Sequence, residues 1–261
     1  MEPHGDPRAL VSGASSGIGE AFARALVRRG RDVVIVARRG ERLQRLREEL
    51  GGERRALSIP IDLASPGAAA RLFDEVTSRG IAVDLLVNNA GIGTTGRYVL
   101  EPPETTAAIL ALNVRAALEL ARAFLPAMLE ARRGAVINVC SMSAFQPVPF
   151  LATYAASKAF LLSFSESLAE ELRGTGVSVQ ALCPGLVPTE FQARAGTDKV
   201  AFNKAPGMTP ELVAEASLVA LETGRVVVIP GWRDRLTIEL QRFVPRVLVC
   251  RIAGALFRPQ P

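Results

Sequence analysis

Histidine and cysteine are scarce in this 261-residue sequence. The one histidine, His4, lies in a terminal tail, and the three cysteines, Cys140, Cys183 and Cys250, are scattered without paired spacing. A Ser-His-Asp triad requires a histidine beside its nucleophile, and zinc sites are built from clustered histidine and cysteine ligands. We therefore expect no triad, no bound metal and no disulfide framework, but reduced thiols of a cytosol-like compartment.

Long apolar runs are also absent, since no stretch reaches the roughly 18 residues expected of a membrane span. No basic and then apolar leader precedes the first predicted strand, at residues 8–11, so we expect no cleaved secretory signal. These absences predict a cytoplasmic protein, whose only membrane contact would be peripheral.

Neither charge sign dominates, since 31 basic and 26 acidic residues give a net charge of +5. Such an excess permits attraction to phosphates, nucleic acid or anionic lipid. Because the arginines are spread along the whole chain, we interpret them as solvated helix faces and expect no nucleic-acid partner. The 49% hydrophobic content excludes a largely disordered chain.

The sequence does contain a regular alternation of short β-branched runs with longer amphipathic segments. We predict strands at residues 9–11, 33–36, 85–87, 135–139, 177–181 and 226–229. Helical spacing of apolar residues predicts helices at about 18–29, 40–50, 66–79, 104–131, 153–173 and 210–222. The alternation predicts an α/β fold: a Rossmann-like doubly wound parallel sheet with helices on both faces.

No linker or internal repeat divides the sequence, so we predict a single domain over residues 1–261. Its motif-bearing part spans about 7–231, and a basic amphipathic tail follows at about 232–261. The longest irregular stretch, about 186–208, has the length of a lid or a binding loop.

Glycines crowd the turn after the first predicted strand, in the order Ser12-Gly13-Ala14-Ser15-Ser16-Gly17-Ile18-Gly19. Glycine lets the backbone turn sharply and approach a pyrophosphate, which then lies at the positive end of the next helix. The spacing is G-x-x-x-G-x-G, not the G-x-G-x-x-G of other dinucleotide folds. A plain tight turn is the alternative, but the position between a strand and a helix favours a dinucleotide site.

The second predicted strand ends at Ala37 and is followed by Arg38 and Arg39. Sites for NAD place an acid here, which holds the ribose 2′-hydroxyl. A guanidinium instead binds a 2′-phosphate through two hydrogen bonds, so the sequence favours NADP(H). We expect Arg38 to supply most of this preference, aided by Ser15, whereas Arg39 either contributes or is only a solvated helix start.

A tyrosine and a lysine stand four residues apart in Tyr154-Ala155-Ala156-Ser157-Lys158. On a helix these positions share a face, so we expect the ammonium of Lys158 beside the phenol of Tyr154. A free tyrosine titrates near pH ~10, and a neighbouring cation is expected to lower the pKa of Tyr154. Ser141 lies thirteen residues upstream at the end of a strand, where its hydroxyl would face the same substrate oxygen. Alone, the pair would be an ordinary helix-surface contact.

With further motifs in the same order, these segments resemble the short-chain dehydrogenase/reductase superfamily in its single-domain form. The resemblance covers about residues 7–231. The motifs that carry it are Ser12-Gly13…Gly17-Ile18-Gly19, Asp62-Leu63, Asn88-Asn89-Ala90-Gly91, Asn113, Ser141, Tyr154…Lys158 and Pro184-Gly185…Thr189.

The resemblance implies a catalytic set of Asn113, Ser141, Tyr154 and Lys158. Ser141 would bind the substrate oxygen and Tyr154 would exchange a proton with it. Lys158 would tune Tyr154 and bind the nicotinamide ribose, and Asn113 would hold a water in a proton relay to Lys158.

The resemblance also implies an NADP(H) site and assembly into a homodimer or homotetramer. Asp62 and Leu63 would border the adenine, and Val187 and Thr189 would contact the nicotinamide end. The cofactor-binding residues implied are Gly13, Ser15, Ser16, Gly17, Ile18, Gly19, Arg38, Arg39, Asp62, Leu63, Asn89, Ala90, Gly91, Tyr154, Lys158, Pro184, Gly185, Val187 and Thr189.

Two positions depart from the family's pattern. Ser12 replaces the usual threonine but keeps a hydroxyl, and residues 142–144 replace a commoner Ala-Gly ending. Ser143 is therefore a rival to Ser141, although the thirteen-residue offset to the tyrosine favours Ser141. Cys140 is expected to be a buried strand residue and not a nucleophile.

Residues 145–151, which separate Ser141 from Tyr154, are almost wholly apolar. They would form either the wall of a pocket for a small apolar ketone or secondary alcohol, or a core-packed loop. In the predicted reaction hydride from NADPH attacks the carbonyl carbon while Tyr154 delivers a proton. The alternative is an NADP-binding scaffold or regulator without turnover, against which the intact catalytic set argues.

The tail carries apolar residues at helical spacing, with arginines between them, over residues 235–258. Pro245 should break it into two helices, because proline removes a hydrogen bond and clashes with the preceding turn. Three roles fit such a pair: contact with an anionic membrane surface, a lid over the substrate pocket, or a contact with another subunit.

Overall fold

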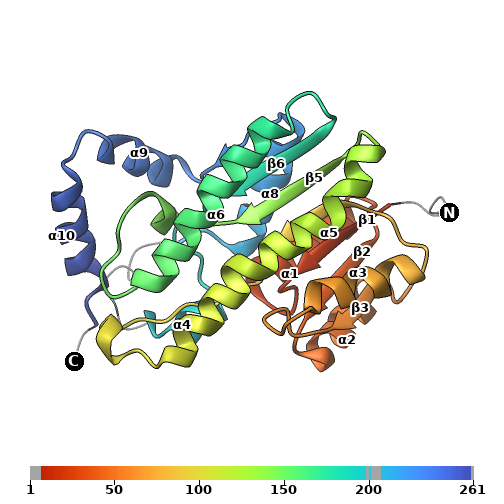
Figure 1. Cartoon of the computed structure of the whole chain (residues 1–261), viewed down its shortest axis with the longest axis horizontal. Helices are drawn as coiled ribbons and strands as arrows, with labels where there is room; N and C mark the ends of the chain where they lie inside the picture. Colours follow the sequence, from red (N-terminus) through yellow and green to blue (C-terminus); the bar gives the residue numbers. More distant parts are fainter. Residues whose placement is uncertain (1–6, 198–199, 201–206, 260–261) are drawn as a thin grey trace.

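A single sheet of seven parallel strands forms the centre of the computed structural model (Figure 1). The structure describes residues 7–197, 200 and 207–259. The strands are β1 (Arg8–Ser12), β2 (Val33–Ala37), β3 (Ala56–Pro60), β4 (Val83–Asn88), β5 (Gly134–Val139), β6 (Val177–Leu182) and β7 (Val227–Val228). Their order in the sheet is β3-β2-β1-β4-β5-β6-β7. The predicted Rossmann-like doubly wound fold is confirmed.

Helices connect the strands and cover both faces of the sheet. The α-helices are α1 (Gly17–Arg28), α2 (Gly40–Glu49), α3 (Ala68–Ser78), α4 (Pro103–Leu110), α5 (Ala116–Glu130), α6 (Ala152–Glu171), α7 (Glu190–Ala195), α8 (Pro210–Glu222), α9 (Trp232–Gln241) and α10 (Arg246–Phe257). Shorter turns are η1 (Tyr98–Leu100), the π turn η2 (Ala111–Arg115) and η3 (Met142–Phe145).

Strand β2 illustrates how the sequence produces the two-faced core. Val33 and Ile35 lie in the cluster with α1, α2 and α8, whereas Val34 and Val36 lie in the cluster with α3 and α5. Successive side chains of a strand point to opposite faces, and all of β2 is buried. A continuous β-branched run therefore suits a strand that is covered on both sides.

Three elements differ from the sequence-based predictions. The predicted helix at 104–131 is divided by the π turn η2 into α4 and α5. Strand β3 is not predicted, because Ser58 and the terminal Pro60 interrupt its apolar run; proline is tolerated there since β3 is an edge strand. At the opposite edge, β7 has two residues instead of the four predicted.

The irregular stretch predicted at 186–208 contains the short helix α7, which opens with a capping box at Thr189. Residues 198, 199 and 201–206 of this stretch lie outside the described residues, as does His4.

The tail forms two helices, as predicted. Helix α9 ends at Gln241 and α10 begins directly after Pro245. Figure 1 shows both at one end of the molecule's longest axis, beside α6 and the loop that precedes it. Within the described part of the chain, no helix has the length and apolarity needed to cross a bilayer.

Candidate active site

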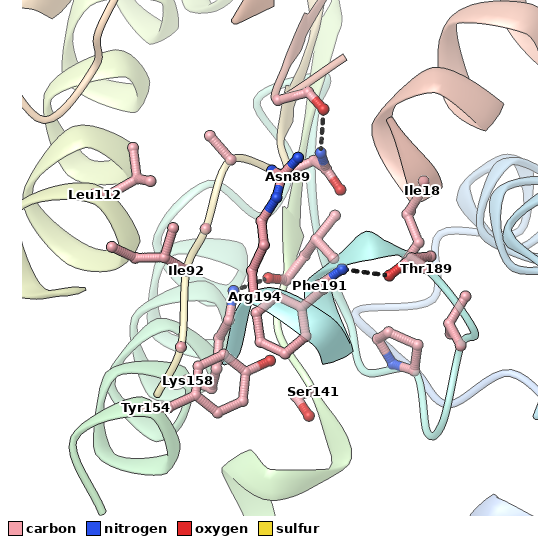
Figure 2. Close-up of a pocket in the computed structure, with 18 of the residues that line it drawn as sticks. Ile18, Asn89, Ile92, Leu112, Ser141, Tyr154, Lys158, Thr189, Phe191 and Arg194 are labelled. Atoms are coloured by element: carbon pink, nitrogen blue, oxygen red, sulfur yellow. Dashed lines mark hydrogen bonds between the residues drawn. The ribbon is translucent and has the colours of Figure 1, made fainter. Parts of the chain in front are cut away.

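A cavity of about 600 Å³ is formed by the loops that follow the carboxyl ends of β1 to β6. This volume lies in the range typical of small-molecule sites, and the carboxyl edge is where doubly wound folds bind ligands. The cavity is lined by every residue predicted for the cofactor or for catalysis except Gly19 and Asn113. The structure thus brings together residues that are far apart in the sequence (Figure 2).

The glycine turn is packed so closely that side chains are excluded from it. Gly13 has a positive φ of 68°, and a Cβ there would lie 2.7 Å from Nδ2 of Asn89. A Cβ on Gly19 would overlap the same amide and the carbonyl oxygen of Gly13. The Asn89 amide uses this proximity to donate to the carbonyl oxygens of Ser12, at 2.9 Å, and Gly13, at 3.3 Å. Gly19 therefore shapes the turn from outside the cavity.

The hydroxyl of Ser12 ties the end of β1 to the loop after β4. Its Oγ accepts hydrogen bonds from the backbone N–H groups of Asn89, at 2.9 Å, and Ala90, at 3.0 Å, and donates to the carbonyl of Val87. A serine supplies every one of these contacts, so the missing methyl group of threonine leaves the turn intact.

Two arginines stand at the end of β2 in different environments. The side chain of Arg38 is 62% exposed, with Nη1 4.0 Å from a carboxylate oxygen of Asp62. Arg39 instead lies over the glycine turn, where its Nη2 donates to the hydroxyls of Ser15, at 2.9 Å, and Ser16, at 2.8 Å. Both arginines line the cavity, so both are available to an anionic group there.

A carboxylate from α7 faces Arg39 and the first turn of α2. Glu190 pairs with Arg39, at 2.9 Å, and also with Arg42 and Arg194. Hydrogen bonds from Arg42 and Arg39 lower the pKa of Glu190 to about 2. The first turn of α7 is thereby linked to the start of α2 across the mouth of the cavity.

At the other end of the cavity lie Tyr154, Lys158 and Ser141, as Figure 2 shows. Helix α6 carries Tyr154 and Lys158 one turn apart, and Ser141 directly follows Cys140 at the end of β5. The Ser141 hydroxyl caps η3 by accepting from the backbone N–H of Ser143 at 3.1 Å. The cap fixes the oxygen of Ser141 beside the phenol.

Burial raises the pKa of Tyr154 to about 12, and a hydrogen bond with Ser141 opposes this only in part. The prediction that Lys158 would lower this pKa is therefore wrong for this structure. The Lys158 ammonium lies 5.8 Å from the ring centroid and donates to the carbonyl oxygen of Val139 at 2.7 Å. Its own pKa is lowered by burial. Loss of water around the phenolate is the largest cause of the raised pKa of Tyr154.

Asn113 lies in the π turn η2, buried behind the cavity wall. Its Oδ1 accepts from the backbone of Ile92 at 2.9 Å, and its Nδ2 donates to the carbonyl of Ile92 and to Oγ of Ser157. Ser157 in turn donates to the carbonyl of Tyr154 at 2.7 Å. The side chain thus anchors α6 at the turn that carries the tyrosine, and its role in a water relay stays a prediction.

Two neighbours of Ser141 also contribute to the cavity wall. Cys140 is buried beside Cys183, whose pKa is raised by its hydrogen bond with Cys140 and by burial, so Cys183 is held as a thiol. Burial of Cys140 agrees with the prediction. Among the described residues, the buried hydroxyl of Ser143 has no hydrogen-bond partner.

The substrate end of the cavity is apolar. Val148, Leu151 and Ala155 form a buried cluster against Tyr154 and Phe257. Residues 145–151 are consequently both a packed loop and a pocket wall, the two alternatives left open by the sequence. Phe191 closes the other side, with its ring centroid 5.3 Å from that of Tyr154.

Several lining residues were not predicted from the sequence. Among them are Ile92, Gly93, Phe191, Gln192, Arg194, Thr197 and Phe257. The segment after Thr189 could have been found by extending the Pro184-Gly185…Thr189 motif into the irregular stretch. Phe257 had no such signal, because the tail's apolar spacing did not say which face would be turned inward.

Comparison with known proteins agrees with this geometry. The family model of the short chain dehydrogenases matches residues 7–200. A short chain dehydrogenase of Pseudocercospora fijiensis is 43% identical over 188 residues, which are 71% of this chain and 61% of that protein. The NADP-dependent 3-hydroxy acid dehydrogenase of Salmonella typhi is 35% identical over 79% of this chain and 86% of its own length.

A solved structure is similar across nearly the whole chain. A short-chain dehydrogenase from Sphingobium yanoikuyae, in complex with NADPH, has a TM-score of 0.80 and 32% identity. The similarity covers 94% of this chain and 95% of that one. The chain belongs to the short chain dehydrogenase family, and it is an oxidoreductase of that class.

Proposed function

We propose that this protein is an NADP(H)-dependent oxidoreductase that interconverts a hydrophobic ketone and its secondary alcohol. The observation that carries the proposal is the meeting of Tyr154, Ser141 and Lys158 at the apolar end of a cavity whose other end holds two arginines. A proton donor, a second hydroxyl and a cation next to an apolar wall suit carbonyl reduction.

The opposite end of the cavity fits a dinucleotide phosphate. The glycine turn leaves no room for side chains, which lets a pyrophosphate approach the start of α1. Arg38 and Arg39 supply guanidinium groups for a 2′-phosphate. The Sphingobium relative binds NADPH, and the Salmonella relative is described as NADP-dependent, which supports the same cofactor here.

Bound NADPH would supply the hydride, and this chain's residues would prepare the carbonyl to receive it. The hydroxyls of Ser141 and Tyr154 would donate hydrogen bonds to the carbonyl oxygen, and Tyr154 would give its proton to that oxygen as the alcohol forms. A pKa of about 12 keeps the phenol protonated at neutral pH, the form that reduction requires. The Lys158 ammonium donates one N–H to the carbonyl oxygen of Val139, and its two other N–H groups would serve the ribose and the phenol side.

The wall around the reacting end determines the proposed substrate class. Val148, Leu151, Phe191 and Phe257 present apolar surface, whereas polar atoms come from Ser141 and Tyr154. A ketone with a bulky apolar group would gain from desolvation there.

We further propose a homodimer or homotetramer in the cytoplasm, to be measured by light scattering and cell fractionation.

Replacing Tyr154 by phenylalanine tests the proposed chemistry. The ring still packs but the transferable proton is lost, so we expect kcat to fall below about one tenth of wild type, with NADPH binding retained. The measurement is NADPH oxidation, followed at the nicotinamide absorbance, with a panel of bulky ketones, small ketones and 3-oxo acids. Binding of NADPH without turnover of any member would favour the scaffold alternative. Turnover by Tyr154→Phe above one tenth would contradict the role of the tyrosine.

A further inference from the structure

The two tail helices expose an apolar stripe on the side that faces away from the body. On α9 the stripe is Trp232, Leu236, Leu240 and, just after the helix, Phe243, which recur every three or four residues. Ile238, on the opposite side of α9, is buried. The exposed fraction rises to 86% at Phe243.

Helix α10 has the same two-faced arrangement. Leu248, Ile252 and Leu256 recur every four residues on its outer face, and Val247 in the first turn is also exposed. Its inner face is already occupied: Ala253 is buried, a Cβ on Gly254 would lie 3.2 Å from Pro149, and Phe257 joins the substrate-cavity cluster. The outer stripe is therefore not the face that closes the pocket, and in the described part of the chain its side chains are 41–65% exposed.

Most of the net positive charge of the molecule lies in the same tail. Residues 232–261 contain six arginines and two acids, a net charge of +4 out of +5 for the whole chain. One acid, Glu239, is paired with Arg242 at 3.1 Å, and the other, Asp234, is half-buried against Gly185 with its pKa raised by burial. The rest of the chain is nearly neutral. The arginines are spread along the whole chain, and the surplus in the tail arises because only two acids accompany its six arginines.

We propose that the outer face of α9 and α10 docks on an anionic phospholipid surface. Apolar side chains would enter the acyl boundary while the arginines that flank them reach the phosphate headgroups. A second copy of this chain fits less well, because a two-fold contact would set two faces of like charge against each other. An apolar partner without acidic groups would leave the arginines desolvated and unpaired.

The corner between the helices is the point that would enter deepest. Pro245 turns the chain there, and Phe243 and Val247 on either side are 86% and 65% exposed. Trp232 at the start of α9 is of the residue type favoured at the headgroup level. Arg258, at the far end of α10, lies over the ring of Phe150 at 5.9 Å, so the docked face borders the loop that walls the substrate cavity.

The experiment is co-sedimentation of the full-length protein with vesicles of phosphatidylcholine alone or with about 30% phosphatidylserine. We expect binding to the anionic vesicles at low salt, and its loss at high salt, because salt screens the arginine–headgroup attraction. The double variant Phe243→Ser with Val247→Ser should bind at least about tenfold less, since two inserted side chains lose their apolar burial. Arg235→Gln with Arg251→Gln should weaken binding and reduce its salt dependence.

The matched control is Leu212→Ser with Val219→Ser on α8, where both side chains are more than half exposed. It should bind vesicles as wild type does, and all variants should keep the wild-type unfolding temperature. The proposal is overturned if wild type does not bind anionic vesicles, or if the corner variant binds equally well. It is also overturned if the corner variant changes the oligomeric state in solution, which would make this face a subunit contact.

Discussion

At the scale of single residues, the site depends on what burial does to a phenol. The pKa of Tyr154 is raised to about 12, so the group is protonated throughout the neutral range. Reduction of a ketone needs the protonated phenol and oxidation of an alcohol needs the phenolate. The two directions must therefore respond to pH in opposite ways.

We expect kcat/KM for alcohol oxidation to rise between about pH 7 and 9, toward tenfold per pH unit, as the phenolate fraction grows below its pKa. Ketone reduction should stay flat over the same range, because the phenol remains protonated. Initial rates in both directions, in buffers of constant ionic strength, measure this. An oxidation rate that is flat or falls with pH would mean that Tyr154 is not the titrating group.

Replacing each of the two serines in the loop after β5 distinguishes a role in substrate binding from a role in packing. Ser141→Ala should lower kcat by about a hundredfold, the usual cost of removing one preorganised donor to a reacting oxygen. Ser143→Ala is the control, because its hydroxyl is buried and has no partner among the described residues, so its loss should leave kcat close to wild type. Unfolding temperatures check that loss of the Ser141 cap leaves the fold intact. Equal losses in both variants would argue against Ser141 as the substrate donor.

The arginines at the end of β2 differ in the hydrogen bonds and ion pairs that each must break in order to bind a phosphate. Arg38 is largely exposed, whereas Arg39 must exchange its bonds to Ser15, Ser16 and Glu190. We therefore expect Arg38→Ala to reduce the NADPH preference over NADH at least tenfold, about 1.4 kcal/mol, and Arg39→Ala to reduce it less.

Cofactor titrations with both dinucleotides measure the ratio of affinities for each variant. Arg45→Ala supplies the control, because Arg45 is exposed on α2 and does not line the cavity. An unchanged ratio in Arg38→Ala would show that the phosphate is held by other groups.

At the scale of elements, α10 is the one whose sequence signal was least informative. Its apolar residues predicted a helix, and Pro245 correctly marked its start, but spacing cannot say which face meets the protein. Small residues decide this in the structure, because Ala253 and Gly254 let the helix approach Pro149 closely. Phe257 then reaches the substrate cavity.

Replacing Phe257 by alanine should enlarge the substrate end of the cavity. We expect kcat/KM for a bulky apolar ketone to fall by about tenfold, with little change for a small ketone, because only the bulky substrate reaches this wall. Leu256→Ala is the matched control, since Leu256 is the neighbouring residue on the exposed face. Similar effects of the two variants would mean that Phe257 acts through stability and not through substrate contact.

The π turn η2 shows a second limit of pattern reading. An apolar helical period continues through residues 104–131, so nothing in it marks the extra residue in the turn. The π turn η2 directs the side chain of Asn113 toward Ile92 and Ser157, which lie 21 and 44 residues away along the chain. Those contacts are tertiary, and periodicity carries no information about them. Asn113 was found only through its place in a motif.

At the scale of the whole molecule, the sheet and most of the site followed from the sequence. Buried parallel strands read as continuous β-branched runs, and their carboxyl ends gather at one edge, so motifs after β1, β4 and β5 were expected to meet. The edge strands β3 and β7 were less predictable, because Ser58 and Pro60 interrupt the apolar run of β3 and because β7 has only two residues. The direction of the Tyr154 pKa shift could not be predicted from the sequence, because it depends on how deeply the structure buries the phenol.

The strand order has a consequence for synthesis of the chain. Strand β1 is central, and its partner β4 emerges from the ribosome only after β2 and β3, with Ala9 paired to Leu85. Such non-local pairings fold slowly, because a long loop must close before any contact compensates for the lost entropy. The cavity wall itself runs from Gly13 to Phe257. A nascent chain therefore carries a growing, exposed sheet edge for most of its translation and acquires a complete substrate site only at the end.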